Sequence, residues 1–74
     1  MKKSRFHEIL NANWPDYQIL SRDKSMTPPR LLTYAVSYFW IHDIRGEDIE
    51  ELRNFARKFH AGEEFFSEDI TWHS

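Results

Sequence analysis

The spacing of hydrophobic and polar residues along this 74-residue chain predicts three helices, over about residues 4–12, 28–43 and 47–60. Between the first two helices, residues 17–21 alternate apolar and polar side chains, which favours a short strand or extended segment. The expected fold class is mostly α: a small three-helix domain, with room for one short two-stranded β pairing between residues 17–21 and 69–73.

Residues that favour helix ends support these boundaries. Ser4 can cap the start of the first helix, and Gly62 can end the third. Thr27 stands directly before Pro28, so we expect its hydroxyl to cap free backbone amides. A proline at the first helical position loses no hydrogen bond, and the second helix therefore has a clear start.

Apolar residues are distributed differently on the second and third helices. On the second helix they continue nearly all round, and only Thr33 and Ser37 interrupt the ring. A helix that is apolar nearly all round must also be covered nearly all round. On the third helix they form one stripe, which indicates packing on a core from one side. This stripe comprises Ile49, Leu52, Phe55, Ala56 and Phe59.

Two arrangements would cover the second helix. In one, it is a central pillar around which the rest of the chain packs, and Phe39 belongs to the core. In the other, a stripe of it stays exposed as the interface of a homodimer or of a complex, because tyrosine and tryptophan are favoured at interfaces. The candidate stripes are Tyr34, Tyr38 and Ile41, or Val36 and Trp40 on the opposite side.

The composition restricts the class of protein. Residues 1–74 suffice for a single small helical domain, whose core alone contributes only a few kcal/mol. Aromatic residues make up 16% of the chain, and no cysteine is present to form disulfides or the usual zinc sites. No apolar run reaches the roughly 18 residues of a membrane span. We therefore expect a cytoplasmic protein without a membrane segment.

Charge is divided unevenly along the chain. Residues 1–37 carry six lysines and arginines against three acids, whereas residues 38–74 carry four against nine. An acidic half of this kind favours association with a basic partner, commonly a nucleic-acid-handling protein. The predicted partner-binding residues are Glu47, Asp48, Glu50, Glu51, Glu63, Glu64, Glu68 and Asp69, with the aromatic residues Tyr34, Tyr38, Trp40 and Trp72.

The C-terminal segment, residues 61–74, combines acids with aromatic residues and has no lysine or arginine. This composition is typical of a segment that docks on a basic, apolar groove of a partner. In the alternative, the aromatic residues of the segment fold back over the core. We expect Phe65 and Phe66 to cover the core and Trp72 to bind the partner.

Catalytic and metal-binding motifs are absent from the sequence. It has no nucleophile elbow, P-loop or dinucleotide fingerprint, and its two glycines lie at helix junctions. The histidines lack the spacing of a zinc-binding helix; they are His7, His42, His60 and His73. We therefore expect no enzyme activity, no cofactor and no metal.

Two features bear on nucleic-acid binding. The second and third helices are joined by a short turn with glycine, as in a helix-turn-helix, but the third begins with acids that would repel the phosphates of duplex DNA. The basic N-terminal half places Trp14 and Tyr17 near positive charges, which suits single-stranded nucleic acid. Duplex DNA binding is not expected, and a small nucleic-acid-binding protein is the weaker alternative.

The sequence favours a small non-enzymatic regulator or inhibitor that binds a basic, nucleic-acid-handling protein through an acidic, aromatic-rich surface. Its general character is similar to that of inhibitors encoded by phages and mobile elements. The main alternative is a homodimeric structural adaptor, which the apolar second helix favours.

Overall fold

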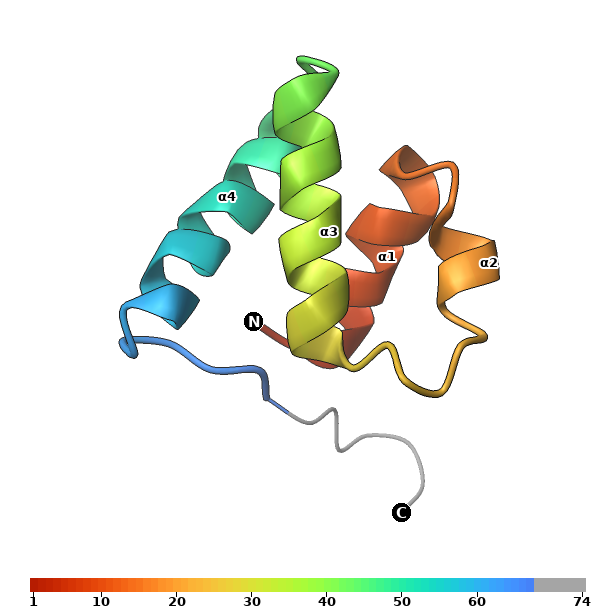
Figure 1. Ribbon diagram of the computed structural model, residues 1–74. Coiled ribbons are helices and arrows are strands. Elements are labelled where there is room, and N and C mark those ends of the chain that lie inside the picture. The colour runs from red at the N-terminus through yellow and green to blue at the C-terminus, as the bar shows by residue number, and fades with distance from the viewer. Residues whose placement is uncertain (68–74) are drawn as a thin grey trace.

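The computed structural model of the protein describes residues 1–67 and shows a mostly helical domain (Figure 1). In this part of the chain the helices are α1 (Lys3–Asn13), α2 (Tyr17–Leu20), α3 (Pro28–Ile41) and α4 (Glu47–His60). The three longer helices confirm those predicted from hydrophobic spacing, and α4 has the predicted ends.

The three longer helices enclose the core. α3 packs against α4, α4 against α1, and α1 against α2. Figure 1 shows α3 standing in front, between α4 and α1. None of the helices in residues 1–67 combines the length and apolar character that crossing a membrane requires. The core comprises Phe6, Ile9, Leu10, Trp14, Leu31, Leu32, Ala35, Phe39, Ile49, Leu52, Phe55 and Ala56.

The starts of α1 and α3 differ from the predictions. α1 begins at Lys3 with Lys2 as its N-cap, so the prediction of Ser4 in this position is wrong. Thr27 does occupy the N-cap of α3, but within the described residues its hydroxyl makes no capping bond. Pro28 and the proline after it fill the first two helical positions and carry no N–H, so a usual target of a capping hydroxyl is missing.

A Schellman motif ends α3. The Ile44 N–H donates to the Phe39 carbonyl at 2.9 Å, and Asp43 between them has a φ of 53°. This cap ends the helix at Ile41, two residues before the predicted end. Gly62, with a φ of 77°, occupies the corresponding left-handed position after α4.

Residues 17–21 do not form a strand, and this prediction is wrong, because most of the stretch belongs to α2. Tyr17 and Leu20, three residues apart, are both half-buried against the core, while Ile19 is 72% exposed. A strand would have buried Tyr17 and Ile19 on one side. One helical turn is too short for hydrophobic spacing to distinguish the two periods. The predicted partner strand, residues 69–73, lies outside the described residues.

His7 and Tyr17 join α1 to α2. The Tyr17 hydroxyl lies 2.7 Å from His7 Nδ1, and the ring centroids are 5.9 Å apart. Partial burial lowers the pKa of His7 below its ordinary value of 6.5, and the charge of Lys3 lowers it further. His7 is therefore neutral at pH 7, and its Nδ1 can accept a hydrogen bond from the hydroxyl.

We expect the free energy of unfolding to fall as the pH drops below 6.5, the ordinary pKa of histidine. In that range the unfolded chain protonates at His7 more readily than the folded chain, so acid favours unfolding; above it the stabilisation is complete. Urea denaturation at several pH values measures this slope. His7→Gln should have a shallower slope, and an identical slope in this variant would contradict the assignment.

The start of the chain lies beside residues 65–67. The Ser67 N–H donates to the Met1 carbonyl at 3.0 Å, and the Lys3 N–H donates to the Ser67 carbonyl at 3.1 Å. Lys2 and Ser67 thereby form an isolated parallel β-bridge. This pairing brings the segment after α4 back across the core.

Phe66 and Phe65 differ in burial although they are neighbours. Phe66 is half-buried, and its ring centroid lies 4.9 Å from Phe6, 5.0 Å from Phe55 and 5.3 Å from Phe59. Phe65 is 67% exposed. Successive side chains in an extended segment point to opposite sides. The prediction that both residues cover the core is therefore confirmed for Phe66 and wrong for Phe65.

Candidate protein-interaction surfaces

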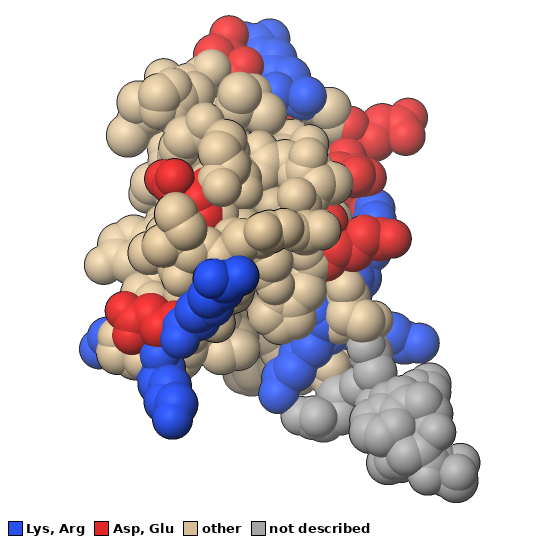
Figure 2. All heavy atoms as spheres, turned by 90° about the vertical axis from the view of Figure 1, so that its right-hand side faces the viewer, with Lys and Arg blue, Asp and Glu red and all other residues tan. Residues whose placement is uncertain are grey.

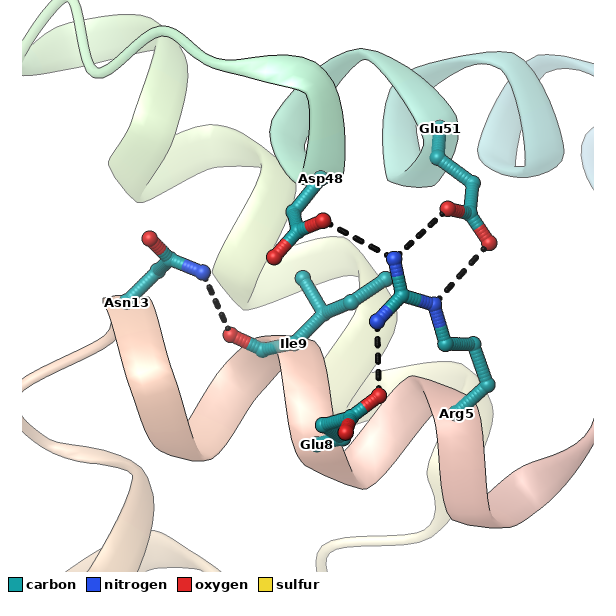
Figure 3. A network of polar contacts seen from close by, with 6 residues as sticks. All are labelled: Arg5, Glu8, Ile9, Asn13, Asp48 and Glu51. Atoms are coloured by element: carbon teal, nitrogen blue, oxygen red, sulfur yellow. Dashed lines mark hydrogen bonds and ion pairs between the residues drawn. The ribbon is translucent and has the colours of Figure 1, made fainter.

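The residues that the sequence groups into one partner-binding surface lie on two sides of the structure. Acids at the start of α4 face α1, and α3 lies behind them in the close view of Figure 3. The exposed aromatic residues Tyr34 and Trp40 belong to α3, which stands in front of α1 and α4 in Figure 1. Glu68, Asp69 and Trp72 lie outside the described residues.

Arg5 on α1 binds three carboxylates at once (Figure 3). Its guanidinium donates two bonds to Glu51, at 2.8 and 3.2 Å, which form a bidentate pair. It also donates to Asp48 at 2.8 Å and to Glu8 at 2.6 Å. Glu51, then Glu8 and Asp48, raise the pKa of the guanidinium above its already high ordinary value. The network therefore ties α1 to the first turns of α4.

The acidic edge, as we call the region around this network, comprises Glu8, Glu47, Asp48 and Glu51. Glu47 lies one helical turn before Glu51 and so on the same side of α4. The acidic edge has four carboxylates, and one guanidinium, that of Arg5, is bound to it. Together these five groups carry three net negative charges at neutral pH. The acidic edge therefore keeps an excess of negative charge after its internal pairing.

The other predicted acids are scattered. Glu50 accepts a hydrogen bond from Arg53 at 3.2 Å, and Glu63 is exposed beyond α4. Glu64 is half-buried and lies in a groove of about 520 Å³ between the chain start and α4. Cations and acids are mixed in this groove, which is lined by Met1, Lys2, Arg5, Glu51, Asn54, Phe55, Lys58 and Glu64.

The outer face of α3 is the second surface, and it comprises Arg30, Thr33, Tyr34, Ser37, Trp40 and Ile41. Trp40 is 73% exposed, Ile41 74% and Tyr34 54%. These residues lie opposite the buried side of the helix, as its 3.6-residue repeat requires. Arg30 is the single charged residue of α3, so this face is apolar and hydroxyl-bearing with one cation at its start.

Three grooves border the outer face of α3. The first, of about 300 Å³, lies at its C-terminal end and is lined by Val36, Ser37, Trp40 and Ile41. The second, of about 380 Å³, is charged and is lined by Trp40, Asp43, Arg45, Glu50 and Arg53. The third, of about 400 Å³, lies toward the end of α4 and is lined by Pro29, Arg30, Thr33, Tyr34, Phe59 and His60. The guanidinium carbon of Arg53 lies 5.6 Å from the centroid of the Trp40 ring and forms a cation–π contact with it.

Charged side chains are also sparse on the side of the molecule that carries α2. Figure 2 shows uncharged residues across the middle of this side and most of the lysines, arginines and acids toward its margins. Ile19 on α2 is 72% exposed, about as much as Trp40. Ile19 therefore provides a matched comparison for substitutions on the outer face of α3.

The exposed side of α3 matches neither predicted stripe completely. Tyr34 and Ile41 from one stripe and Trp40 from the other are exposed. Tyr38 and Val36, one from each stripe, are half-buried against the core. α3 is therefore a central pillar on one side and an uncovered helix on the other.

The predicted stacking surface for single-stranded nucleic acid does not form on Trp14. This residue is only 5% exposed and belongs to the core, so that part of the interpretation is wrong. Tyr17 is half-buried with its hydroxyl directed at His7. Arg5, which belongs to the basic N-terminal half, is bound by carboxylates of the acidic edge.

No protein-family model, curated protein or solved structure matches this chain. Among residues 1–67, no group of three or more histidine or acidic side chains is placed to hold a metal ion. The acidic edge and the outer face of α3 are the two candidate surfaces, and they differ in charge and in exposed apolar area.

Proposed function

We propose that the protein is a small non-enzymatic binding protein that docks on another protein through the outer face of α3. The 73% exposure of Trp40 carries this proposal. Ile41 and Tyr34 extend the exposed apolar surface along the same helix. Large contiguous apolar patches are uncommon on monomeric proteins, whereas tryptophan and tyrosine are enriched at interfaces and dominate their binding energy.

The exposed area of Trp40 is large enough to contribute substantially to binding. A tryptophan buries roughly 150–250 Å², so covering the exposed part of this residue removes about 150 Å² from water. At about 25 cal/mol per Å², that burial contributes roughly 4 kcal/mol before the costs of association. The buried side of α3 holds the helix in place, so docking needs little backbone rearrangement.

The acidic edge favours a second candidate function, the regulation or inhibition of a basic protein such as one that handles nucleic acid. Its three net negative charges would attract such a partner and speed association. Arg5 holds Asp48 and Glu51 in one arrangement, which such a partner would meet preformed. A phage or mobile-element origin and a cytoplasmic location stay predictions from the sequence.

A capture experiment with matched variants tests docking through the outer face of α3. Tagged parent protein is compared with Trp40→Glu, which places a charge in that face, and with Ile19→Glu, which alters an equally exposed residue on α2. We expect a partner that the parent and Ile19→Glu retain and Trp40→Glu loses. Loss of the partner in both variants, or in neither, would contradict the proposal.

A further variant in the same experiment tests the acidic edge. Glu8→Gln combined with Glu47→Gln removes two charges and leaves Asp48 and Glu51 bound to Arg5. A partner bound through the acidic edge should associate more slowly with this variant, and the rate should depend less on salt. Association rates equal to those of the parent would exclude the acidic edge as the contact surface.

A further inference from the structure

We infer that the outer face of α3 binds the same face of a second copy of this chain, with the two α3 helices antiparallel and Ser37 near the two-fold axis. The inference rests on the proposed function and names the partner of the same surface. A two-fold contact requires a surface that complements itself. The order of residues, the surface relief and the charge of the outer face each meet this requirement.

The order of residues along α3 is suited to antiparallel pairing about Ser37. In such a pair, each residue lies at the same height along the helices as the residue of the second copy that is equally far from Ser37 in the other direction. Trp40 and Ile41 of one copy then lie at the height of Tyr34 and Thr33 of the other. This arrangement occurs twice, once on each side of the axis, and the small side chain of Ser37 lets the helices approach closely.

The surface relief is also self-complementary. Trp40 and Ile41 are the most exposed large apolar residues of α3 and lie at its C-terminal end. The groove of about 400 Å³ lies at the opposite end, between Tyr34 and Phe59. Antiparallel pairing brings the projecting residues of one copy to this groove of the other copy.

The positive charge of Arg30 favours an antiparallel over a parallel arrangement of the two α3 helices. Arg30, the single charge on α3, lies seven positions before Ser37. Antiparallel pairing separates the two guanidiniums by about 20 Å, well beyond the roughly 8 Å Debye length at physiological salt. Parallel pairing would place them side by side. Each Arg30 instead approaches the C-terminal end of the second α3, where the helix dipole is negative.

The size of the outer face indicates a dimer that depends on protein concentration. Trp40 and Tyr34 together expose roughly 250 Å² per copy, since an aromatic residue buries about 150–250 Å². With the smaller residues of the face, the contact reaches roughly 500 Å² per copy, below the about 800 Å² of a standard interface. We therefore expect a dissociation constant on the order of micromolar.

Sedimentation velocity over a series of protein concentrations tests the self-association. We expect the parent to shift from monomer to dimer, and Trp40→Glu to weaken the dimer at least about tenfold. Ile41→Glu, a second variant of the same face, should also weaken it. Ile19→Glu on α2 should leave the dissociation constant unchanged. Circular dichroism of each variant verifies that the helices are retained.

Cysteine cross-linking tests the geometry, and each introduced thiol is unique because the chain has no cysteine. Ser37→Cys should form a disulfide between copies, since residues at the axis come within the roughly 7 Å that a disulfide spans. Chains with Thr33→Cys and chains with Ile41→Cys, when mixed, should cross-link to each other rather than to themselves. Ile19→Cys is the negative control.

The outcomes separate this inference from the proposed function. A parent protein that stays monomeric, while its capture of another protein still depends on Trp40, would overturn the inference alone. A dimer that neither Trp40→Glu nor Ile41→Glu weakens would also overturn it, because another surface would then join the copies. If capture is independent of Trp40 as well, both proposals fail.

Discussion

Replacement of Phe39 by alanine should lower the free energy of unfolding by about 3–5 kcal/mol. Phe39 is fully buried on α3, in the core to which α1 and α4 contribute. Truncation removes a large apolar surface and leaves a cavity that the surrounding helices can fill only in part. A domain of this size has little stability to spare, so the loss is comparable with the whole free energy of folding.

Urea denaturation followed by circular dichroism measures the effect of Phe39→Ala. Tyr34→Ala is the matched control, because it removes an aromatic ring from the same helix where the residue is 54% exposed. This control should change the free energy of unfolding by less than about 1 kcal/mol. A Phe39→Ala variant that loses no more stability than Tyr34→Ala would contradict the role of α3 as the central core helix.

The long helices could be predicted from the sequence because each repeats its apolar positions over several turns. α4 was the clearest case, since its single apolar stripe is combined with acids in the first turn and basic residues in the last. α2 could not be predicted, because four residues make about one helical turn. The alternation of polar and apolar residues there favoured the two-residue repeat of a strand over the 3.6-residue repeat of a helix.

The acids of the candidate site could be predicted as surface residues, but their partner could not. The spacing of Arg5 and Glu8 is that of a pair on one helix, and this local signal is visible in the sequence. Asp48 and Glu51 lie more than 40 positions further along the chain. Their contact with Arg5 depends on how α1 packs against α4, which hydrophobic spacing does not specify.

The exposed side of α3 could be recognised only in part for a related reason. Large apolar residues occur on both its buried and its exposed side, so the sequence indicates that the helix needs covering without indicating which side the chain itself covers. α1 and α4 cover the side that carries Leu32 and Phe39. Trp40 and Ile41 are left exposed on the other side.

Phe66→Ala should lower the free energy of unfolding by about 2 kcal/mol, whereas Phe65→Ala should change it by less than about 0.5 kcal/mol. Phe66 is half-buried in a cluster of rings and lies 4.9 Å from Phe6 between centroids. Such ring pairs contribute roughly 0.5–1.5 kcal/mol beyond the burial of their area. The neighbouring Phe65 is 67% exposed, so its truncation removes little packing.

Loss of Phe66 should also weaken the pairing between residues 65–67 and the start of the chain. The amide of Ser67 donates to Met1 and the amide of Lys3 donates to Ser67, so hydrogen exchange at both amides reports on this pairing. Exchange should be faster in Phe66→Ala and unchanged in Phe65→Ala, under conditions where both variants remain folded. The two substitutions remove the same atoms from adjacent positions, so only the ring contacts differ. Equal losses of stability and of amide protection would show that Phe66 does not anchor this segment to the core.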